Sequence, residues 1–239
     1  MQTRLYLLLS AWLIVSCAPV REMSNKEKHM PSIGDIGKHS KSLVHSTFHK
    51  VGTPSLKDPI ALSVMEFPFT KSKFKKYLEM ETAKGKKPRL TYVDSLPNKP
   101  KYLCVEIADK IGIKEALNYA HNNGVKTYLE NDDQYTIITK IAVTSDKATM
   151  TALTKSDAIS LIDNRNGNIT LEVLKGQDRS FINLSTMEVF DYEVSGFCWG
   201  ETKYGKKQIE ALSSNGESCP RGTEKKAYKL DNSTSFLKL

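Results

Sequence analysis

Two acidic residues near the middle of the C-terminal half have spacing that suits hydrolysis. Asp191 and Glu193 alternate with apolar neighbours, so on a strand both carboxylates point to one side, roughly 7 Å apart. Paired carboxylates at such a distance can act as general acid and base. Solvent-facing acids on a strand have the same spacing, however. The chain has no nucleophile elbow, zinc-protease motif, phosphate-binding glycine loop or dinucleotide fingerprint. The sequence therefore predicts a binding protein rather than an enzyme, with a carboxylate-based hydrolase as the alternative.

Histidines offer a second possible chemistry, metal binding. His39, His45 and His49 lie in one polar segment, and the last two are spaced i, i+4. On a helix this spacing would direct two imidazoles at one metal ion. No carboxylate or cysteine lies close enough to complete the ligand set, and the segment does not have a helical pattern. His121 lies at a predicted helix C-terminus, where a cation complements the helix dipole. We expect no metal and no cofactor.

Two acidic segments resemble calcium ligands only in part. Residues 163–168 place Arg165 at the third position of a calcium loop and Gly167 at the fifth, whereas the EF-hand needs an oxygen ligand third and glycine sixth. This segment is predicted to be a hairpin turn. Glu130, Asp132 and Asp133 could bind a cation weakly but are more typical of a solvated turn.

A basic segment over residues 71–89 has the composition of a weak polyanion site. Phe74 and Tyr77 interleave with the lysines, so charge could supply attraction and the rings contact. The same pattern fits an amphipathic helix with a solvated lysine face, which is the interpretation we favour. The candidate anion-binding residues are Lys73, Lys75, Lys76, Lys86 and Lys87.

The N-terminus has the pattern of an export signal. Arg4 precedes an apolar run over residues 5–15. Eleven residues are too few to span a bilayer, which needs roughly 20, but they match the core of a signal peptide.

The run ends in Ile14-Val15-Ser16-Cys17, which resembles the lipobox of bacterial lipoproteins. The resemblance implies that Cys17 carries lipid, that residues 1–16 are removed, and that acyl chains hold the protein at a membrane. It also implies export to the outer membrane or periplasmic face in a Gram-negative bacterium. In the lipoproteins of enteric bacteria, an aspartate directly after the lipidated cysteine resembles an inner-membrane retention signal. This chain has Ala18 at that position. Secretion without lipid, after cleavage near Cys17, is the alternative.

Three cysteines remain if Cys17 is lipidated: Cys104, Cys198 and Cys219. Their spacing does not fit a zinc site, and an exported chain meets an oxidising compartment. The two later cysteines lie in segments rich in turn residues, where a cross-link stabilises most. We therefore predict a Cys198–Cys219 disulfide and a reduced, partly buried Cys104.

Charge is distributed unevenly along the chain. The 239 residues carry a net charge of +8. Residues 21–101 contain 17 basic and 8 acidic residues, a net of +9, whereas residues 102–239 contain 17 and 19, a net of −2. The excess positive charge thus lies in the part nearer the predicted anchor. An exported protein rarely meets nucleic acid, so the expected anions are lipid headgroups or polysaccharides.

Composition divides the chain into three parts. Residues 1–16 are the signal peptide. Residues 17–56 are rich in Lys, Ser, Gly and His and predict a flexible polar spacer, because they offer little apolar area to offset the entropy of ordering. Residues 57–239 are long enough for one good-sized domain.

Hydrophobic periodicity within 57–239 predicts short helices and many strands. Helices are expected after the N-caps Thr70, Asp109 and Asp146. Strands are expected at 60–67, 89–93, 102–107, 125–129, 135–143, 158–162, 169–174, 181–184, 190–198 and 227–230. The fold class is therefore α+β, with mostly antiparallel pairing and a β-rich C-terminal half. Together with the lipobox, this suggests a membrane-tethered binding or assembly module with an envelope protein or glycan as its partner.

Overall fold

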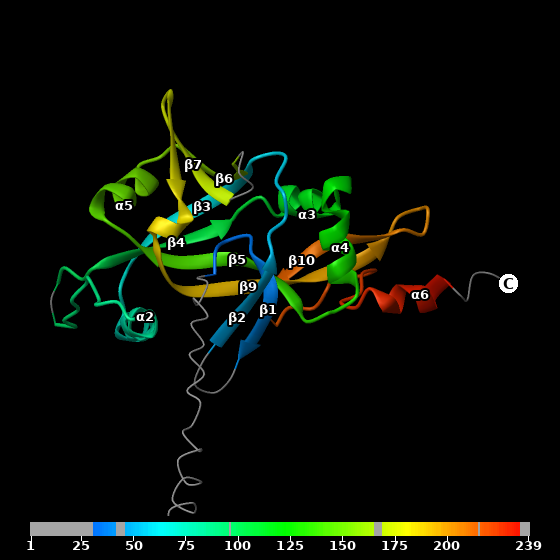
Figure 1. Ribbon diagram of the computed structural model, residues 1–239, viewed down its shortest axis with the longest axis horizontal. Coiled ribbons are helices and arrows are strands. Elements are labelled where there is room, and N and C mark those ends of the chain that lie inside the picture. The colour runs from blue at the N-terminus through cyan, green and yellow to red at the C-terminus, as the bar shows by residue number, and fades with distance from the viewer. Residues whose placement is uncertain (1–30, 42–45, 96, 165–168, 215, 235–239) are drawn as a thin grey trace, which may run out of the picture.

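A large antiparallel sheet forms the frame of the molecule (Figure 1). The computed structural model describes residues 31–41, 46–95, 97–164, 169–214 and 216–234. The strands are β1 (Ile36–Lys41), β2 (Ser46–Gly52), β3 (Ile60–Pro68), β4 (Lys101–Ile107), β5 (Tyr135–Thr144), β6 (Ala158–Asp163), β7 (Ile169–Lys175), β8 (Asp178–Asn183), β9 (Glu188–Glu201) and β10 (Lys207–Ser214). The helices are α2 (Lys71–Ala83), α3 (Lys110–Asn118), α4 (Asn123–Glu130), α5 (Lys147–Thr154) and α6 (Tyr228–Thr234), with short 3₁₀ turns η2 (Ala120–Asn122) and η3 (Leu184–Thr186). The fold is α+β, as the sequence predicts.

The central strand of the sheet is β5. The main strand order is β10-β9-β5-β4-β3-β6-β7-β8, and β1 also pairs with β5. One edge of β5 pairs with β9, and the other edge is shared: β1 takes its first residues and β4 takes residues 140–143. Three strands therefore depend on one strand for their hydrogen bonds.

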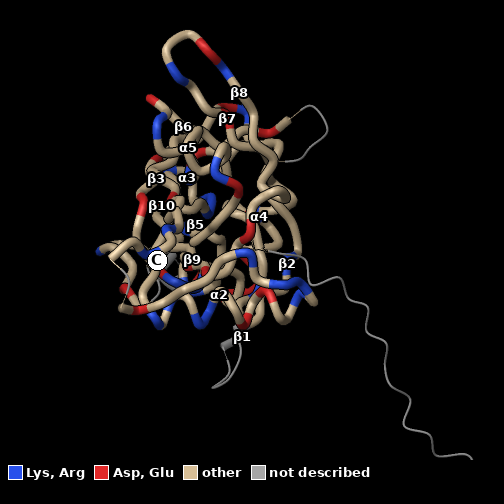
Figure 2. Tube along the Cα trace, turned by 90° about the vertical axis from the view of Figure 1, so that its left-hand side faces the viewer, with Lys and Arg blue, Asp and Glu red and all other residues tan. Residues whose placement is uncertain are grey.

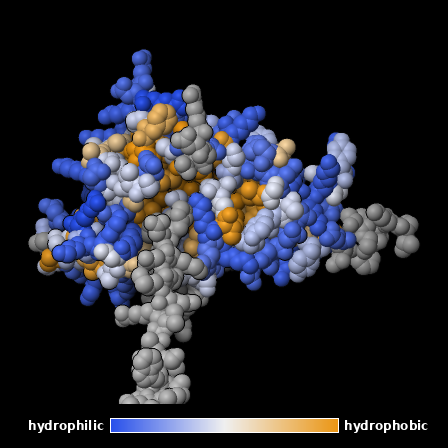
Figure 3. Space-filling model, in the orientation of Figure 1, coloured by the Kyte–Doolittle hydropathy of each residue, from blue (hydrophilic) through white to orange (hydrophobic). Residues whose placement is uncertain are grey.

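The two faces of the sheet have different partners. Leu103, Val105 and Ile107 of β4 point into the main core, to which α3, α4 and α5 also contribute. Tyr102, which directly precedes Leu103 and points to the opposite face, belongs to a second, aromatic cluster under α2. The period of two in β4 thus separates the faces as predicted. Figure 3 shows hydrophobic residues gathering at the centre of one side of the molecule.

Helix starts agree with their predicted caps. The Thr70 hydroxyl accepts from Lys73 N, and the Asp109 carboxylate from Gly112 N. Asp146 accepts from Ala148 N and Thr149 N. Backbone and side-chain hydrogen bonds from Thr149 are the main reason that the pKa of Asp146 falls to about 2.

The prediction of a flexible spacer over 17–56 is wrong for residues 31–41 and 46–56, the part of this range that the structure describes. Ile33 and Ile36 are fully buried in the main core. Residues 36–38 pair with β5, and β1 and β2 form a hairpin. Gly37 permits the close approach, because a Cβ there would collide with the His49 carbonyl oxygen. Low average hydrophobicity hides the two isoleucines, which are enough to fix the segment once β5 provides a hydrogen-bonding edge.

Three shorter predictions are also wrong. Residues 125–129 form α4 rather than a strand, because Val125 and Leu129, four residues apart, both reach the core on a helix. Residues 227–230 form the start of α6 and the residue before it, not a strand. Ala227 and Leu230, three residues apart, are both buried there. Residues 89–93 form no strand.

The cysteine prediction is confirmed. Cys198 of β9 and Cys219 form a disulfide with Cα atoms 5.6 Å apart. Cys104 is reduced and half-buried on β4, and burial raises the pKa of its thiol.

Replacing Ile36 with alanine tests whether β1 belongs to the fold. Truncating this 2% exposed side chain should lower the free energy of unfolding by roughly 2–5 kcal/mol. Chemical denaturation of the full chain measures it. Ser40→Ala on the exposed part of the same strand is the matched control and should change little. Equal stability of the two variants would mean that β1 is a dispensable tether.

Candidate functional site: the basic insertion over residues 69–100

A long excursion leaves the sheet between β3 and β4. These strands pair directly, with Pro68 opposite Lys101, and Phe69 N donates to Pro100 O at 2.9 Å. Residues 69–100, here called the insertion, therefore start and end at one point. An excursion of this length is not needed to join two adjacent strands, and such loops often carry function.

An aromatic cluster fixes the insertion to the sheet. Phe69, Phe74 and Tyr77 from the insertion meet Tyr102 of β4 and Phe190 of β9. The Phe69 ring lies 5.0 Å from Tyr102 and 5.3 Å from Phe190, centroid to centroid. Phe74 and Tyr77 are the residues that the sequence suggested as rings interleaved with lysines, and both face inward. They pack as core and are not available to stack on a ligand.

Two of the candidate lysines bind the same carboxylate. Lys73 Nζ lies 2.7 Å and Lys76 Nζ 3.0 Å from Asp191 Oδ2. Burial acts to raise the pKa of Asp191, but the hydrogen bonds and charges of the two lysines outweigh it and hold the pKa below its usual range. For Lys73, burial acts to lower the pKa, and Asp191 outweighs it, so the pKa of Lys73 is raised. This pair of salt bridges joins α2 to β9, so two of the five candidate lysines are already bound within the protein.

A second polar group lies at the C-terminal end of α2. Glu81 is fully buried, and Lys84 Nζ reaches its Oε1 at 2.5 Å and Val189 O at 3.2 Å. Glu188 accepts from the Tyr77 hydroxyl at 3.3 Å and pairs with Arg89 Nε at 3.0 Å. A carboxylate is buried only with such partners. These contacts anchor the end of α2 and the loop after it.

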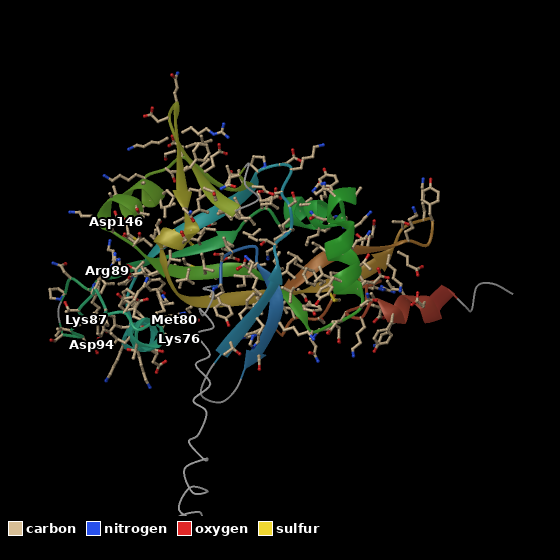
Figure 4. The ribbon with its side chains drawn as sticks, viewed as in Figure 1. Lys76, Met80, Lys87, Arg89, Asp94 and Asp146 are labelled. Carbon is tan, nitrogen blue, oxygen red and sulfur yellow. A yellow bond between two sulfur atoms is a disulfide. The ribbon has the colours of Figure 1, made fainter. Side chains whose placement is uncertain are left out.

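The remaining candidate lysines point outward. Lys75 lies 3.7 Å from Glu79, an exposed pair that contributes little. The side chains of Lys86 and Lys87 are exposed and have no partner among the described residues. Figure 4 places Lys76, Lys87 and Arg89 in one region around α2. Figure 2 shows lysine and arginine positions, in blue, near the label of α2. Of the five candidate lysines, Lys75, Lys86 and Lys87 are therefore the ones whose side chains remain open to solvent.

The carboxylates proposed for hydrolysis are both bound to lysines. Asp191 is held by α2 as described. Glu193 of β9 pairs with Lys140 of the neighbouring strand β5, at 3.3 Å. Lys140 also pairs with Glu106 of β4, at 3.2 Å. A general acid needs a raised pKa, whereas that of Asp191 is lowered. Asp191 is therefore not suited to act as the general acid of such a pair.

The histidines and the acidic turn are scattered. The His39 ring packs 5.6 Å from Tyr192, and His49 lies on the other face of the hairpin. His121 Nε2 lies 3.2 Å from Ser55 O. His45 and residues 165–168 are outside the described residues. Within the part of the chain that the structure describes, no three His, Cys, Asp or Glu residues gather as a metal site.

The acidic turn instead makes three separate ion pairs. Glu130 binds Lys207, Asp132 binds Lys38, and Asp133 binds Lys226, at 3.2, 2.6 and 3.1 Å. The acidic turn thus connects distant parts of the chain.

Sequence reasoning missed the buried carboxylates Glu81 and Glu188. Each looks like an ordinary surface acid in the sequence, and only the spacing of Glu81 and Lys84, i and i+3, gave a signal. Sequence reasoning also missed a shallow pocket of about 210 Å³ between α3 and β10. None of the predicted site residues lines this pocket. Its lining is Lys114, Glu115, Asn118, Tyr119, Gln208 and Ile209.

No family model matches this chain, and neither does any curated protein or any solved structure. No helix in the described ranges is long and apolar enough to cross a membrane.

Asp191→Asn tests the bridge between α2 and β9. Because the pKa of Asp191 is lower in the folded state than its unfolded value of about 3.9, its contribution is present above that value and is lost as the pH falls through the folded value. We expect the variant to be about 1 kcal/mol less stable at pH 7, a modest figure because the pair is partly open to solvent. The deficit should shrink as the pH falls below the unfolded value of about 3.9.

Denaturation curves at pH 7 and at low pH measure this difference. Glu193→Gln, whose side chain is 66% exposed, is the matched control and should show a much smaller change. A deficit that persists unchanged at low pH would assign the role of Asp191 to packing and not to charge.

Proposed function

We propose that this protein is an exported, lipid-anchored protein of the cell envelope that acts by binding rather than by turnover. The observation that carries the proposal is Ile14-Val15-Ser16-Cys17 directly after the apolar run. Lipid on Cys17 would anchor the chain at the outer membrane or the periplasmic face of a Gram-negative bacterium. The partner would be an anionic lipid surface, an envelope protein or a glycan.

The disulfide gives independent support for export. Disulfides persist in the periplasm and other oxidising compartments and are rare in the cytosol. Cys198 is fully buried, so its bond to Cys219 is part of the fold and not an exposed, regulatory pair. A chain that needs this bond is best folded outside the cytoplasm.

The start of the fold fits a position close to the anchor. Thirteen residues, 18–30, separate Cys17 from the first described residue, Pro31. Even fully extended, the chain from Cys17 to Pro31 spans no more than about 50 Å. The domain would therefore work within a few nanometres of its membrane.

The outward lysines of the insertion suit attraction without stereospecific recognition. Lysine is a compact point charge on a flexible stem, whereas arginine recognises phosphate or carboxylate in a fixed two-bond geometry. Arg89, the one arginine here, is bound to Glu188. The insertion would thus favour any nearby anionic surface, and salt would weaken the contact.

Cys17→Ser tests the anchor. Without the thiol no lipid can be attached, so the variant should stay as an uncleaved precursor or be released. Phase partitioning and gel mobility measure both effects. Cys104→Ser is the control and should behave as the parent chain. If Cys17→Ser partitions and migrates like the parent, the lipobox interpretation is wrong.

Neutralising the insertion tests its contact with anions. In a released form carrying Cys17→Ser, the combined change Lys75→Gln, Lys86→Gln and Lys87→Gln should weaken adsorption to vesicles containing anionic lipid. The loss should be about three- to tenfold at low salt and smaller at high salt.

The matched control removes three exposed lysines elsewhere: Lys147→Gln, Lys155→Gln and Lys175→Gln. Sedimentation with vesicles measures both sets. Equal losses would show that only net charge matters, and unchanged adsorption would return the insertion to an ordinary solvated surface.

A further inference from the structure

The outer edge of β2 is unpaired. Among the described residues β2 pairs only with β1, so half of its N–H and C=O groups point away from the sheet. Such an edge can accept another strand, and proteins usually protect it with charges, bulges or covering side chains.

The edge strand at the other end of the sheet, β10, is protected. The Asn118 side chain of α3 donates to Ile209 O at 2.7 Å and accepts from Ile209 N at 3.0 Å. Its amide thereby takes the place of a neighbouring strand. Further along, Ser214 N donates to the Glu217 carboxylate, and Glu217 N donates to Ser214 O. Side chains and turns thus occupy backbone groups at both ends of β10.

The third edge strand, β8, carries protecting charges. Asp178 and Arg179 start it, and Arg179 pairs with Glu172 of β7. β2 has one charge of this kind, Lys50, and that charge is directed away from the edge. Lys50 Nζ lies 2.7 Å from Asp35, which is 1% exposed.

The two sides of β2 differ. Phe48 packs on Tyr192, 5.9 Å between ring centroids, and Lys50 binds Asp35, so these side chains fix β2 on the body. Thr47 and His49 are exposed. A bulge at Val51, where the register with β1 shifts, leaves residues 46–50 as the regular stretch.

We propose that β2 pairs with β2 of a second copy of this chain, antiparallel and centred on Phe48. Two-fold symmetry places Thr47 of each copy opposite His49 of the other. A β-branched residue then meets an aromatic one, a favourable cross-strand pair. No unpaired charge faces its own copy, because Lys50 is neutralised by Asp35. The contact is closed and isologous, so it makes a dimer and not a fibre.

This inference goes beyond the proposed function and does not require it. Five residues on each side bury little area, so the dimer should be weak for free chains. Anchoring two chains in one membrane would raise their effective concentration and strengthen it. The tests below report on β2 whether or not Cys17 carries lipid.

Charge variants test the pairing in solution. The full chain with Thr47→Lys and His49→Lys places like charges opposite each other in the homodimer, and so does the chain with Thr47→Glu and His49→Glu. Each should sediment as a monomer at concentrations where the parent chain is partly dimeric. Mixing the two should restore dimers, at least about tenfold more than either alone.

The matched control places the same charges on β8, with Phe181→Lys and Ser180→Lys. It should dimerise as the parent does. A parent chain that is monomeric at every concentration, both in solution and on vesicles, overturns the proposal. Loss of dimer without rescue on mixing overturns it as well.

Cysteine cross-linking tests the register. Thr47→Cys and His49→Cys together should link two chains under mild oxidation, because the paired Cα atoms would lie about 4.5–5.5 Å apart. Either change alone should link at least about fivefold less, since each residue lies two positions from its own copy. The parent chain gives the background from its native thiols, and Arg179→Cys with Phe181→Cys on β8 is the matched control.

Two cross-linking results would count against the proposal. Strong linking of Thr47→Cys alone would place the chains in another register. A product whose mass is not that of two copies would show that β2 receives a strand from another protein.

Discussion

Pairing along both edges of β5 is the constraint on which the rest of the structure depends. Five of its seven residues over 137–143 are buried, and buried backbone groups must find hydrogen-bond partners. β9 satisfies one edge, and β1 and β4 share the other. Each of these strands brings a different part of the molecule into place: β1 brings the N-terminal hairpin, β4 the end of the insertion, and β9 the disulfide and the partners of α2.

The insertion combines a tightly packed inner side with outward lysine charges that recognise no particular anion. Its aromatic side chains and buried carboxylates fix α2 on the sheet. Its exposed side chains include several lysines. Asp191 separates the lysines into two groups, because it binds Lys73 and Lys76 and leaves Lys75, Lys86 and Lys87 toward solvent. Under the proposed function, such a surface would adhere to anions without selecting among them.

Local patterns in the sequence predicted local structure well. The caps at Thr70, Asp109 and Asp146, the alternation in β4 and the Cys198–Cys219 bond follow from neighbouring residues and simple chemistry. The errors arose where a distant partner decides. β1 depends on the edge of β5, and α4 forms because the core accepts Val125 and Leu129 from a helix. For the basic site, the lysine positions were readable, but their pairing with Asp191, more than 100 residues away, was not.

The close attachment of β1 to β5 has a mechanical consequence. In the proposed anchored form, a pull on the membrane end of the chain would not be absorbed by a long slack tether. It would pass through Gly34 and Asp35, whose backbone groups bond to Ile138, straight into the central strand. In that form, force on the anchor would therefore reach the centre of the sheet before any other part of the fold.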